Sequence, residues 1–286
     1  MRPAGKPKLP CAARRGAVLA LSLIVPLCAV ADDQPLWEWG LGPSVVAFSD
    51  YPGSASLHLY ALPLPYVRYR GTFLRADREG LRGQLLDTSI VAVNVNLGAS
   101  VPVRSRDDAA RTGMPNLDAL LEVGPVLAVH LWSTESRRFL LDARMPTRLA
   151  LTVSSTPRAV GGYLAPQLDL DVRHLGGAPG WSLGLLAGPL FASQRYNQYF
   201  YSVPPRYATF ARPAYSAPAG YAGSEFIAAI SRRFRGFWVG GFVRYMNLEG
   251  AVFGDSPLLQ RHQDFAGGLG IAWILGRSSR HVEAEE

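Results

Sequence analysis

Three segments of this chain alternate between aliphatic and polar residues with a period of two. In residues 90–101 the odd positions are aliphatic, and the even positions become polar or small along the segment. Residues 141–153 and 162–174 repeat the alternation, with charged residues gathered on one face of each. Successive side chains of a β-strand point to opposite faces of the sheet. Each segment therefore predicts a strand with one apolar and one polar face.

Nine further segments have strand character, which gives about 12 predicted strands in total. About 10 strands is the alternative, because bacterial β-barrels made of one chain favour even numbers of strands. They are residues 37–48, 60–70, 72–77, 81–86, 118–132, 181–192, 224–234, 237–247 and 263–275. Beyond the N-terminal segment the sequence has no run of about 18 apolar residues that would predict a transmembrane helix. A closed barrel is the other structure that satisfies its backbone groups inside a membrane. We therefore expect an all-β fold, a transmembrane antiparallel β-barrel.

The first 31 residues have the organisation of a signal peptide. Basic residues precede the apolar stretch GAVLALSLIVPLCAVA, which ends in the small-x-small sequence Ala29-Val30-Ala31. We predict cleavage after Ala31 and export to the outer membrane of a Gram-negative bacterium. The expected organisation is a signal peptide at 1–31, a barrel at 32–275 and a polar C-terminal tail at 276–286.

Removal of this segment changes the composition of the chain. It holds five of the 29 Lys and Arg residues and none of the 22 acidic residues, so the mature chain is close to neutral. The basic charge of the whole chain therefore does not indicate a nucleic-acid partner. Cys11 and Cys28 are the two cysteines, and both lie in the segment. The mature chain is expected to form neither a disulfide nor a thiolate metal site.

The longest predicted loop, residues 193–223, is rich in tyrosine and arginine and contains no acidic residue. Tyrosine and arginine are enriched at interface hot spots, and Pro204-Pro205 stiffens the segment. We predict a partner-binding surface here, suited to acidic murein or lipid phosphate; packing of the loop as a plug in the barrel is the equal alternative. The candidate residues are Arg195, Tyr196, Tyr199, Phe200, Tyr201, Arg206, Tyr207 and Arg212.

The charged faces of residues 141–153 and 162–174 form the second candidate site. Buried charges need partners, so we expect an ion-pair network on the lumen face. Its members are Asp142, Arg144, Arg148, Asp169, Asp171 and Arg173. Such a network could make a pore selective. A calcium ion held by Asp169 and Asp171 is the weaker alternative.

Catalytic arrangements are weak in this sequence. His174 falls on the aliphatic face of its strand, opposite the aspartates, which favours a structural role. His262, with Asp264 and Ser256 nearby, is the one arrangement a hydrolase could use. We expect no catalytic residue, no cofactor and no metal, and thus a protein that is not an enzyme.

Several short motifs occur together in a fixed order. They are DYPGS (50–54), LPLPYVRYRG (62–71), LEVGP (121–125), GPLFASQRYNQYFYSV (188–203), YAGS (221–224) and SPLLQRH (256–262). With this set the chain resembles the MipA/OmpV family of outer-membrane proteins over residues 37–275. The resemblance implies contact with outer-membrane lipid and lipopolysaccharide. It also implies a scaffold that joins a membrane-bound lytic transglycosylase to a bifunctional murein synthase; other members resemble adhesins or porin-like proteins.

Three function classes remain open: a scaffold for murein remodelling, a small-solute pore, and a barrel hydrolase. The scaffold interpretation requires the aromatic loop, residues 193–223, to face the periplasm. Counted as the loop after the eighth strand, with both termini periplasmic, it does so. One strand fewer upstream would turn it outward, so the side on which it lies stays open.

Overall fold

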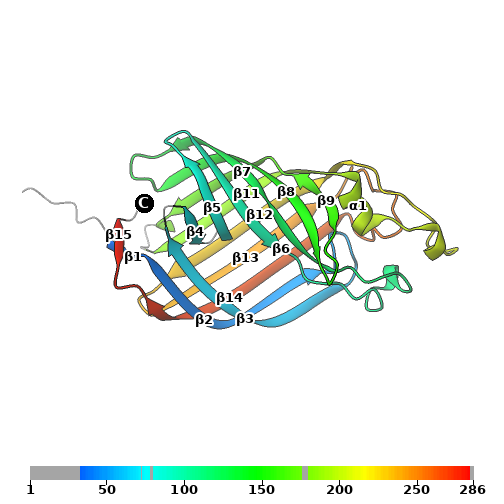
Figure 1. The fold of residues 1–286 in the computed structure, drawn as a ribbon, viewed down its shortest axis with the longest axis horizontal. Coiled ribbons are helices and arrows are strands. Elements are labelled where there is room, and N and C mark those ends of the chain that lie inside the picture. The colour runs from blue at the N-terminus through cyan, green and yellow to red at the C-terminus, as the bar shows by residue number, and fades with distance from the viewer. Residues whose placement is uncertain (1–32, 72, 78–79, 176–179, 284–286) are drawn as a thin grey trace, which may run out of the picture.

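The computed structural model of this chain describes residues 33–71, 73–77, 80–175 and 180–283. They form a barrel of tilted strands, with long loops gathered beyond one end (Figure 1). The predicted signal peptide, residues 1–31, lies outside the described residues. In the part of the chain that is described, no helix has the length and apolar character needed to cross a membrane.

Thirteen strands belong to one sheet. They are β2 (Trp37–Ser49), β3 (Leu57–Arg70), β4 (Leu74–Asp77), β5 (Gly80–Asp87), β6 (Val91–Ala99), β7 (Ala119–Ser133), β8 (Phe139–Val153), β9 (Ala159–Leu164), β10 (Gln167–Arg173), β11 (Trp181–Ala192), β12 (Gly220–Arg233), β13 (Phe237–Asn247) and β14 (Gln263–Arg277). The loops contain the helix α1 (Gln194–Tyr201) and 3-10 turns at Ala109–Arg111 and Pro205–Tyr207.

The sheet closes on itself because β14 pairs with β2 and every other strand pairs antiparallel with its neighbours. β9 and β10 are two halves of one strand, since each pairs with β8 on one side and β11 on the other. Ala165 and Pro166 separate the halves, where proline interrupts the ladder. Counted in this way the ring has 12 strands, and the prediction of a 12-stranded antiparallel barrel is confirmed.

Alternation along each strand separates an apolar outside from a mixed lumen. On β14 the odd-numbered Phe265, Leu269 and Trp273 are exposed on the outer surface, while Ala266 and Ala272 are buried on the inner side. Exposed aliphatic and aromatic side chains continue over the other strands. An outward apolar band with aromatic residues is the surface that a barrel presents to lipid.

Close approach of strands explains two glycines in the Gly-Pro dipeptides of the barrel wall. A Cβ on Gly42 would lie 1.9 Å from the carbonyl oxygen of Ile271, and a Cβ on Gly124 would lie 1.9 Å from that of Thr147. Real Cβ atoms do not come this close to a carbonyl oxygen. Glycine is therefore required where the neighbouring strand is pressed against the backbone.

The two ends of the barrel differ. At one end β1 (Asp33–Pro35) pairs with β15 (His281–Glu283), so the two ends of the described chain lie together (Figure 1). The predicted polar tail at 276–286 thus begins within β14 and contains β15.

The aromatic loop follows β11, which is the ninth strand of the ring and not the eighth. It lies at the end opposite the paired termini (Figure 1). The count of eight strands before the loop was therefore one short, and of the two sides left open the loop lies at the far mouth, because an odd number of strands precedes it.

Candidate functional site

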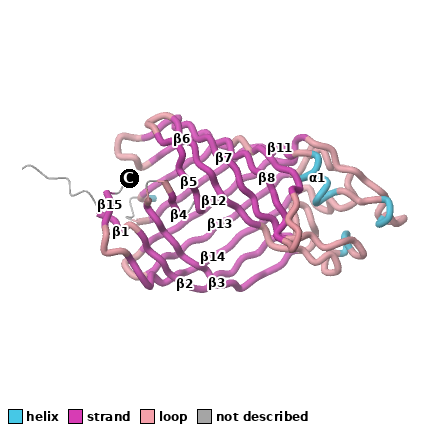
Figure 2. Tube along the Cα trace, viewed as in Figure 1, coloured by secondary structure: helices cyan, strands magenta, loops and turns pink. Residues whose placement is uncertain are grey.

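Four loops interlock over the mouth opposite the termini, and we call them the cap. They comprise residues 50–56, 100–118, 193–219 and 248–262 (Figure 2). Their apolar side chains join inward-facing residues of the barrel in one buried cluster. The cluster contains Tyr51, Val103, Met114, Leu117, Ala192, Tyr201, Val203, Ala217, Ala222, Met246, Leu248, Ala251, Phe253 and Leu258. The cap is therefore packed into the mouth.

Tyr201 lies at the centre of the cap. Its ring stacks on Phe253 with 3.7 Å between the ring centroids. The Tyr201 hydroxyl donates a hydrogen bond to the Pro52 carbonyl at 2.8 Å, and the Tyr201 carbonyl accepts one from Ser256 Oγ at 2.6 Å. One side chain thus connects three of the four loops. Aromatic packing and satisfied hydrogen bonds together favour a rigid cap.

The helix α1 directs its aromatic side chains into the mouth. It begins after Ser193, whose hydroxyl accepts a hydrogen bond from the Tyr196 amide at 3.4 Å and caps the first turn. The Tyr196 hydroxyl donates to Glu122 Oε1 at 3.2 Å, and the Tyr163 hydroxyl donates to Glu122 Oε2 at 2.8 Å. Glu122 belongs to the lumen face of β7. The helix is therefore fixed to the inside of the barrel wall.

A buried polar centre links the fourth loop of the cap, residues 100–118, to two of the other three. Arg111, only 3% exposed, donates to the carbonyl of Phe200 at 3.1 Å and to that of Pro115 at 3.3 Å. Asp108 accepts a hydrogen bond from Ser54 Oγ at 2.8 Å. Burial lowers the pKa of Arg111 from its ordinary value. These contacts hold the 100–118 loop against α1.

Burial also raises the pKa of the cap tyrosines. The pKa of Tyr199 rises to about 12 because desolvation disfavours the phenolate. The pKa values of Tyr196 and Tyr201 rise well above the ordinary value for the same reason. These three phenols are therefore neutral hydrogen-bond donors at physiological pH.

The residues predicted as a partner-binding surface divide into two groups. Tyr196, Tyr199, Phe200 and Tyr201 pack within the cap, which is the arrangement of the plug alternative. The side chain of Arg212 donates to the carbonyls of Ala110, Thr112 and Tyr207. Arg195 and Arg206 remain exposed, with the Arg206 guanidinium 4.9 Å from the centroid of the Tyr207 ring.

The predicted lumen charges lie on the inner faces of β8 and β10. Arg144 Nη1 lies 2.8 Å from Asp169 Oδ2, and Asp142 Oδ1 lies 2.9 Å from His130 Nδ1. The strand register places Asp169 directly opposite Asp142. The Asp169–Arg144 pair gives this carboxylate an arginine partner.

Arg148, Asp171 and Arg173 continue the same inner faces. Arg148 lies over Gly98, where an added Cβ would be 2.5 Å from Arg148 Nη1. Asp171 and Arg173 follow Asp169 on the inner face of β10. No group of three or more His, Cys, Asp or Glu side chains in the described ranges is arranged to hold a metal ion.

Two further charge clusters were not predicted from the sequence. The carboxylate of Glu38, 1% exposed, forms an ion pair with the guanidinium of Arg233, whose Nε lies 3.1 Å from Glu38 Oε2. Arg70 Nη2 lies 3.8 Å from the same oxygen. The sequence signal that could have indicated this cluster is the position of Glu38 between Trp37 and Trp39. These two side chains face outward, so Glu38 between them faces the lumen.

The second cluster lies near the cap. Arg244 Nη1 lies 3.9 Å from Glu225 Oε1, and Arg244 Nη2 lies 3.7 Å from Asp264 Oδ2. Asp264 was the acid of the alternative hydrolase arrangement, and here it faces an arginine. Ser256 of that arrangement donates its hydroxyl to the Tyr201 carbonyl. The two side chains are thus engaged in structural contacts.

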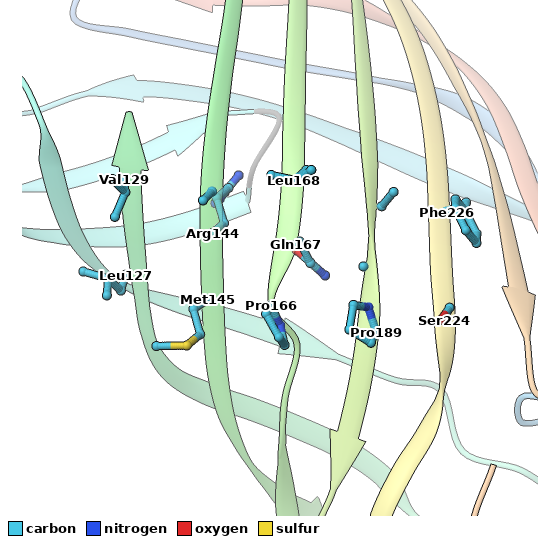
Figure 3. A pocket seen from close by; sticks show the side chains of 13 residues that line it. Leu127, Val129, Arg144, Met145, Pro166, Gln167, Leu168, Pro189, Ser224 and Phe226 are labelled. Atoms are coloured by element: carbon cyan, nitrogen blue, oxygen red, sulfur yellow. The ribbon is translucent and has the colours of Figure 1, made fainter. Parts of the chain in front are cut away.

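A groove of about 670 Å³ runs over the outer wall where β9 and β10 meet (Figure 3). Pro166 lies at the strand break, and Met145, Leu168, Pro189 and Phe226 line the groove around it. These side chains are apolar and belong to the outward faces of their strands. Arg144, Gln167 and Ser224 complete the lining, and the apolar character of the rest suits lipid chains.

Comparison with known proteins gives a family match over most of the chain. The model of the family described as MltA-interacting protein MipA matches residues 41–275. No curated protein sequence matches the chain. Among solved structures, the crystal structure of the toluene transporter TbuX of Ralstonia pickettii matches with 10% identity and a TM-score of 0.25. That match covers 86% of this chain and 71% of the transporter.

Proposed function

The chain belongs to the MipA family, and from this premise we propose that it is a non-enzymatic outer-membrane barrel that acts as a scaffold for murein remodelling. The family description names an interaction with MltA, a membrane-bound lytic transglycosylase. In this proposal the transglycosylase binds on the periplasmic side, and a murein synthase joins the same assembly. Both ends of the described chain lie at the mouth opposite the cap, so the proposal puts that mouth in the periplasm and the cap at the cell exterior.

The observation that carries the proposal is an arginine-rich rim around the mouth with the termini. We define the rim as the turns at 133–138, 232–237 and 277–280. The guanidinium of Arg232 lies 4.5 Å from the ring centroid of Phe234 and 5.6 Å from that of Trp181. Exposed arginines continue along the turns; they include Arg235, Arg277 and Arg280. Arginine and aromatic side chains in this arrangement are those enriched at interface hot spots.

Copurification from crosslinked cells tests the proposal. The rim variant carries Arg235→Gln, Arg277→Gln and Arg280→Gln. The matched control carries Arg195→Gln, Arg206→Gln and Arg261→Gln, three exposed arginines of the cap. We expect a lytic transglycosylase to copurify with the wild type and the cap variant, and recovery to fall at least tenfold for the rim variant.

The reverse result would move the partner surface to the aromatic loop. If both variants recover as much transglycosylase as the wild type, neither arginine set takes part, and the proposed rim is overturned. Heat-modifiable migration on gels serves as the folding control for each variant. A barrel that folds and retains no transglycosylase at all would contradict the scaffold function itself.

The cap tip favours a second candidate function, attachment to a surface or molecule outside the cell. Phe210 is fully exposed in the turn between Thr209 and Arg212. In this function the aromatic ring at the end of the projecting loop is the anchor that a partner covers. Phe210→Ser should reduce adhesion of whole cells if this function holds, and should leave recovery of the transglycosylase unchanged.

A further inference from the structure

The barrel wall has an opening between β3 and β6. β3 pairs with β2 at every position from Leu57 to Tyr69, but with β4 only at Tyr69 and Arg70. The β4–β5 hairpin covers only the half of the wall nearer the termini (Figure 2). Toward the cap, the edge of β3 that faces away from β2, from Leu57 to Arg68, has no strand partner among the described residues.

This edge lies at the depth of the apolar belt. The outward residue Trp39 is paired with Val67, and Ser49 is paired with Leu57, so the open edge spans the same depth as most of β2. Leu57, Leu59 and Val67 are all exposed on the outer face. An open sheet edge facing lipid is unfavourable unless it borders a water-filled cavity or a bound molecule.

Two prolines show that the sequence treats β3 as an edge strand. The amide of Arg70 donates to the Leu36 carbonyl at 2.8 Å, on the β2 side. Backbone groups alternate in direction along a strand, so even-numbered amides face β2 and odd-numbered positions face the opening. Pro63 and Pro65 are odd-numbered and lack the N–H that an added strand would require. A strand from a second copy or a partner is therefore a poor occupant.

Behind the opening the lumen is apolar and incompletely filled. Leu62 faces inward opposite Ser44, yet it is 42% exposed; the inward-facing Phe242 is 40% exposed. A Cβ on Gly268 would lie 3.0 Å from Phe242 and 2.8 Å from Val46, so Phe242 and Val46 approach this glycine closely. Large apolar side chains exposed toward a lumen indicate space for an apolar ligand.

The β6 side of the opening is polar. Asn96 is the last residue of β6 that pairs with β5 and is only 2% exposed. Within the described part of the chain, its side-chain oxygen accepts no hydrogen bond. A buried acceptor without a donor is costly. A ligand hydroxyl or carboxylic acid could supply the missing donor.

We propose that the opening is a lateral portal for a single-chain amphiphile, whose aliphatic chain enters the lumen from the membrane and lies against Leu62 and Phe242. Its hydrogen-bonding head is directed toward Asn96. Access from the side is consistent with a mouth that the cap fills. This binding site goes beyond the scaffold function and does not depend on it.

Binding of cis-parinaric acid, a fluorescent fatty acid, to the purified barrel tests the portal. The variant Leu62→Gln changes the lumen face of β3, and Leu59→Gln is the matched control on the outer face of the same strand. We expect Leu62→Gln to weaken binding about tenfold, as loss of a buried leucine contact predicts. Phe242→Gln should act similarly, and Leu59→Gln should bind like the wild type.

Competition identifies the head group. Displacement of the probe by both oleic acid and monoolein assigns a site that accepts any hydrogen-bonding head. Displacement by oleic acid alone restricts the site to acids. Failure of both competitors, or equal probe binding by all four proteins, would overturn the portal and leave only adsorption to the outer surface.

A cysteine at the edge provides an independent check. The chain has no cysteine beyond Cys28, so Ala61→Cys introduces one thiol into the described part of the barrel. Under the proposal this outward-facing thiol does not form disulfides between copies. Rapid disulfide formation between copies would place a second barrel at the edge and contradict the portal.

Discussion

The ring of Tyr201 lies flat against the ring of Phe253, with 3.7 Å between centroids and an angle of 9° between planes. This stack joins the loop after β11 to the loop after β13. Truncation by Tyr201→Ala should destabilise the cap by about 3 kcal/mol, since it removes a fully buried aromatic side chain. Trypsin should then cut after Arg206 much faster than in the wild type. Phe210→Ala, at the exposed tip, is the control and should leave the cleavage rate unchanged.

Replacement of Glu38 tests the charge cluster at the opposite end. Glu38→Gln leaves Arg233 and Arg70 without their shared carboxylate inside the wall. Loss of one member of a buried ion pair typically costs about 3 kcal/mol or more. Urea unfolding in lipid vesicles should show this loss in the free energy of unfolding. Glu249→Gln, at an exposed turn, should change it by less than about 0.5 kcal/mol; equal effects would refute a role for the cluster.

A methyl group at Gly124 should disturb the strand pairing. The added Cβ would lie 1.9 Å from the Thr147 carbonyl oxygen, so the backbone of β7 or β8 must move. Overpacking of this kind costs about 1–3 kcal/mol. Gly124→Ala should therefore fold with lower yield and unfold at lower urea. Gly236→Ala, with no atom within 4 Å of its Cβ, should match the wild type.

Alkaline pH should open the cap before the barrel unfolds. Burial raises the pKa of Tyr199 to about 12, while an unfolded tyrosine ionises near about pH 10. Above that pH the open cap binds fewer protons than the packed cap, so the stability of the cap falls as pH rises. Tyrosinate absorbance should increase in two steps. The exposed phenols ionise first, and the cap phenols ionise at higher pH, where proteolysis of the cap also becomes faster. Ionisation of all tyrosines in one step near about pH 10 would contradict the buried cap.

The strands were predictable because alternation depends on local sequence alone. Residues 141–153 and 162–174 carry charges on one face, and the structure pairs them as β8 with β9 and β10. The break at Pro166 was missed, because a proline at an irregularity leaves the surrounding alternation intact.

The cap could not be derived from periodicity. Helix α1 has eight residues, too few to show a helical stripe. The motifs DYPGS and SPLLQRH contribute Tyr51, Ser54, Ser256 and Leu258 to the cap. Their function in the fold is contact between loops distant in sequence, which local patterns do not encode.

The side of the membrane on which a partner binds is the point to measure first. A photo-crosslinking residue placed at Arg235 on the rim, and in a separate strain at Phe210 on the cap, reports contacts in intact cells. We predict adducts with a lytic transglycosylase from position 235 and none from position 210. Adducts from position 210 alone would place the partner at the cap and contradict the proposed function of the rim.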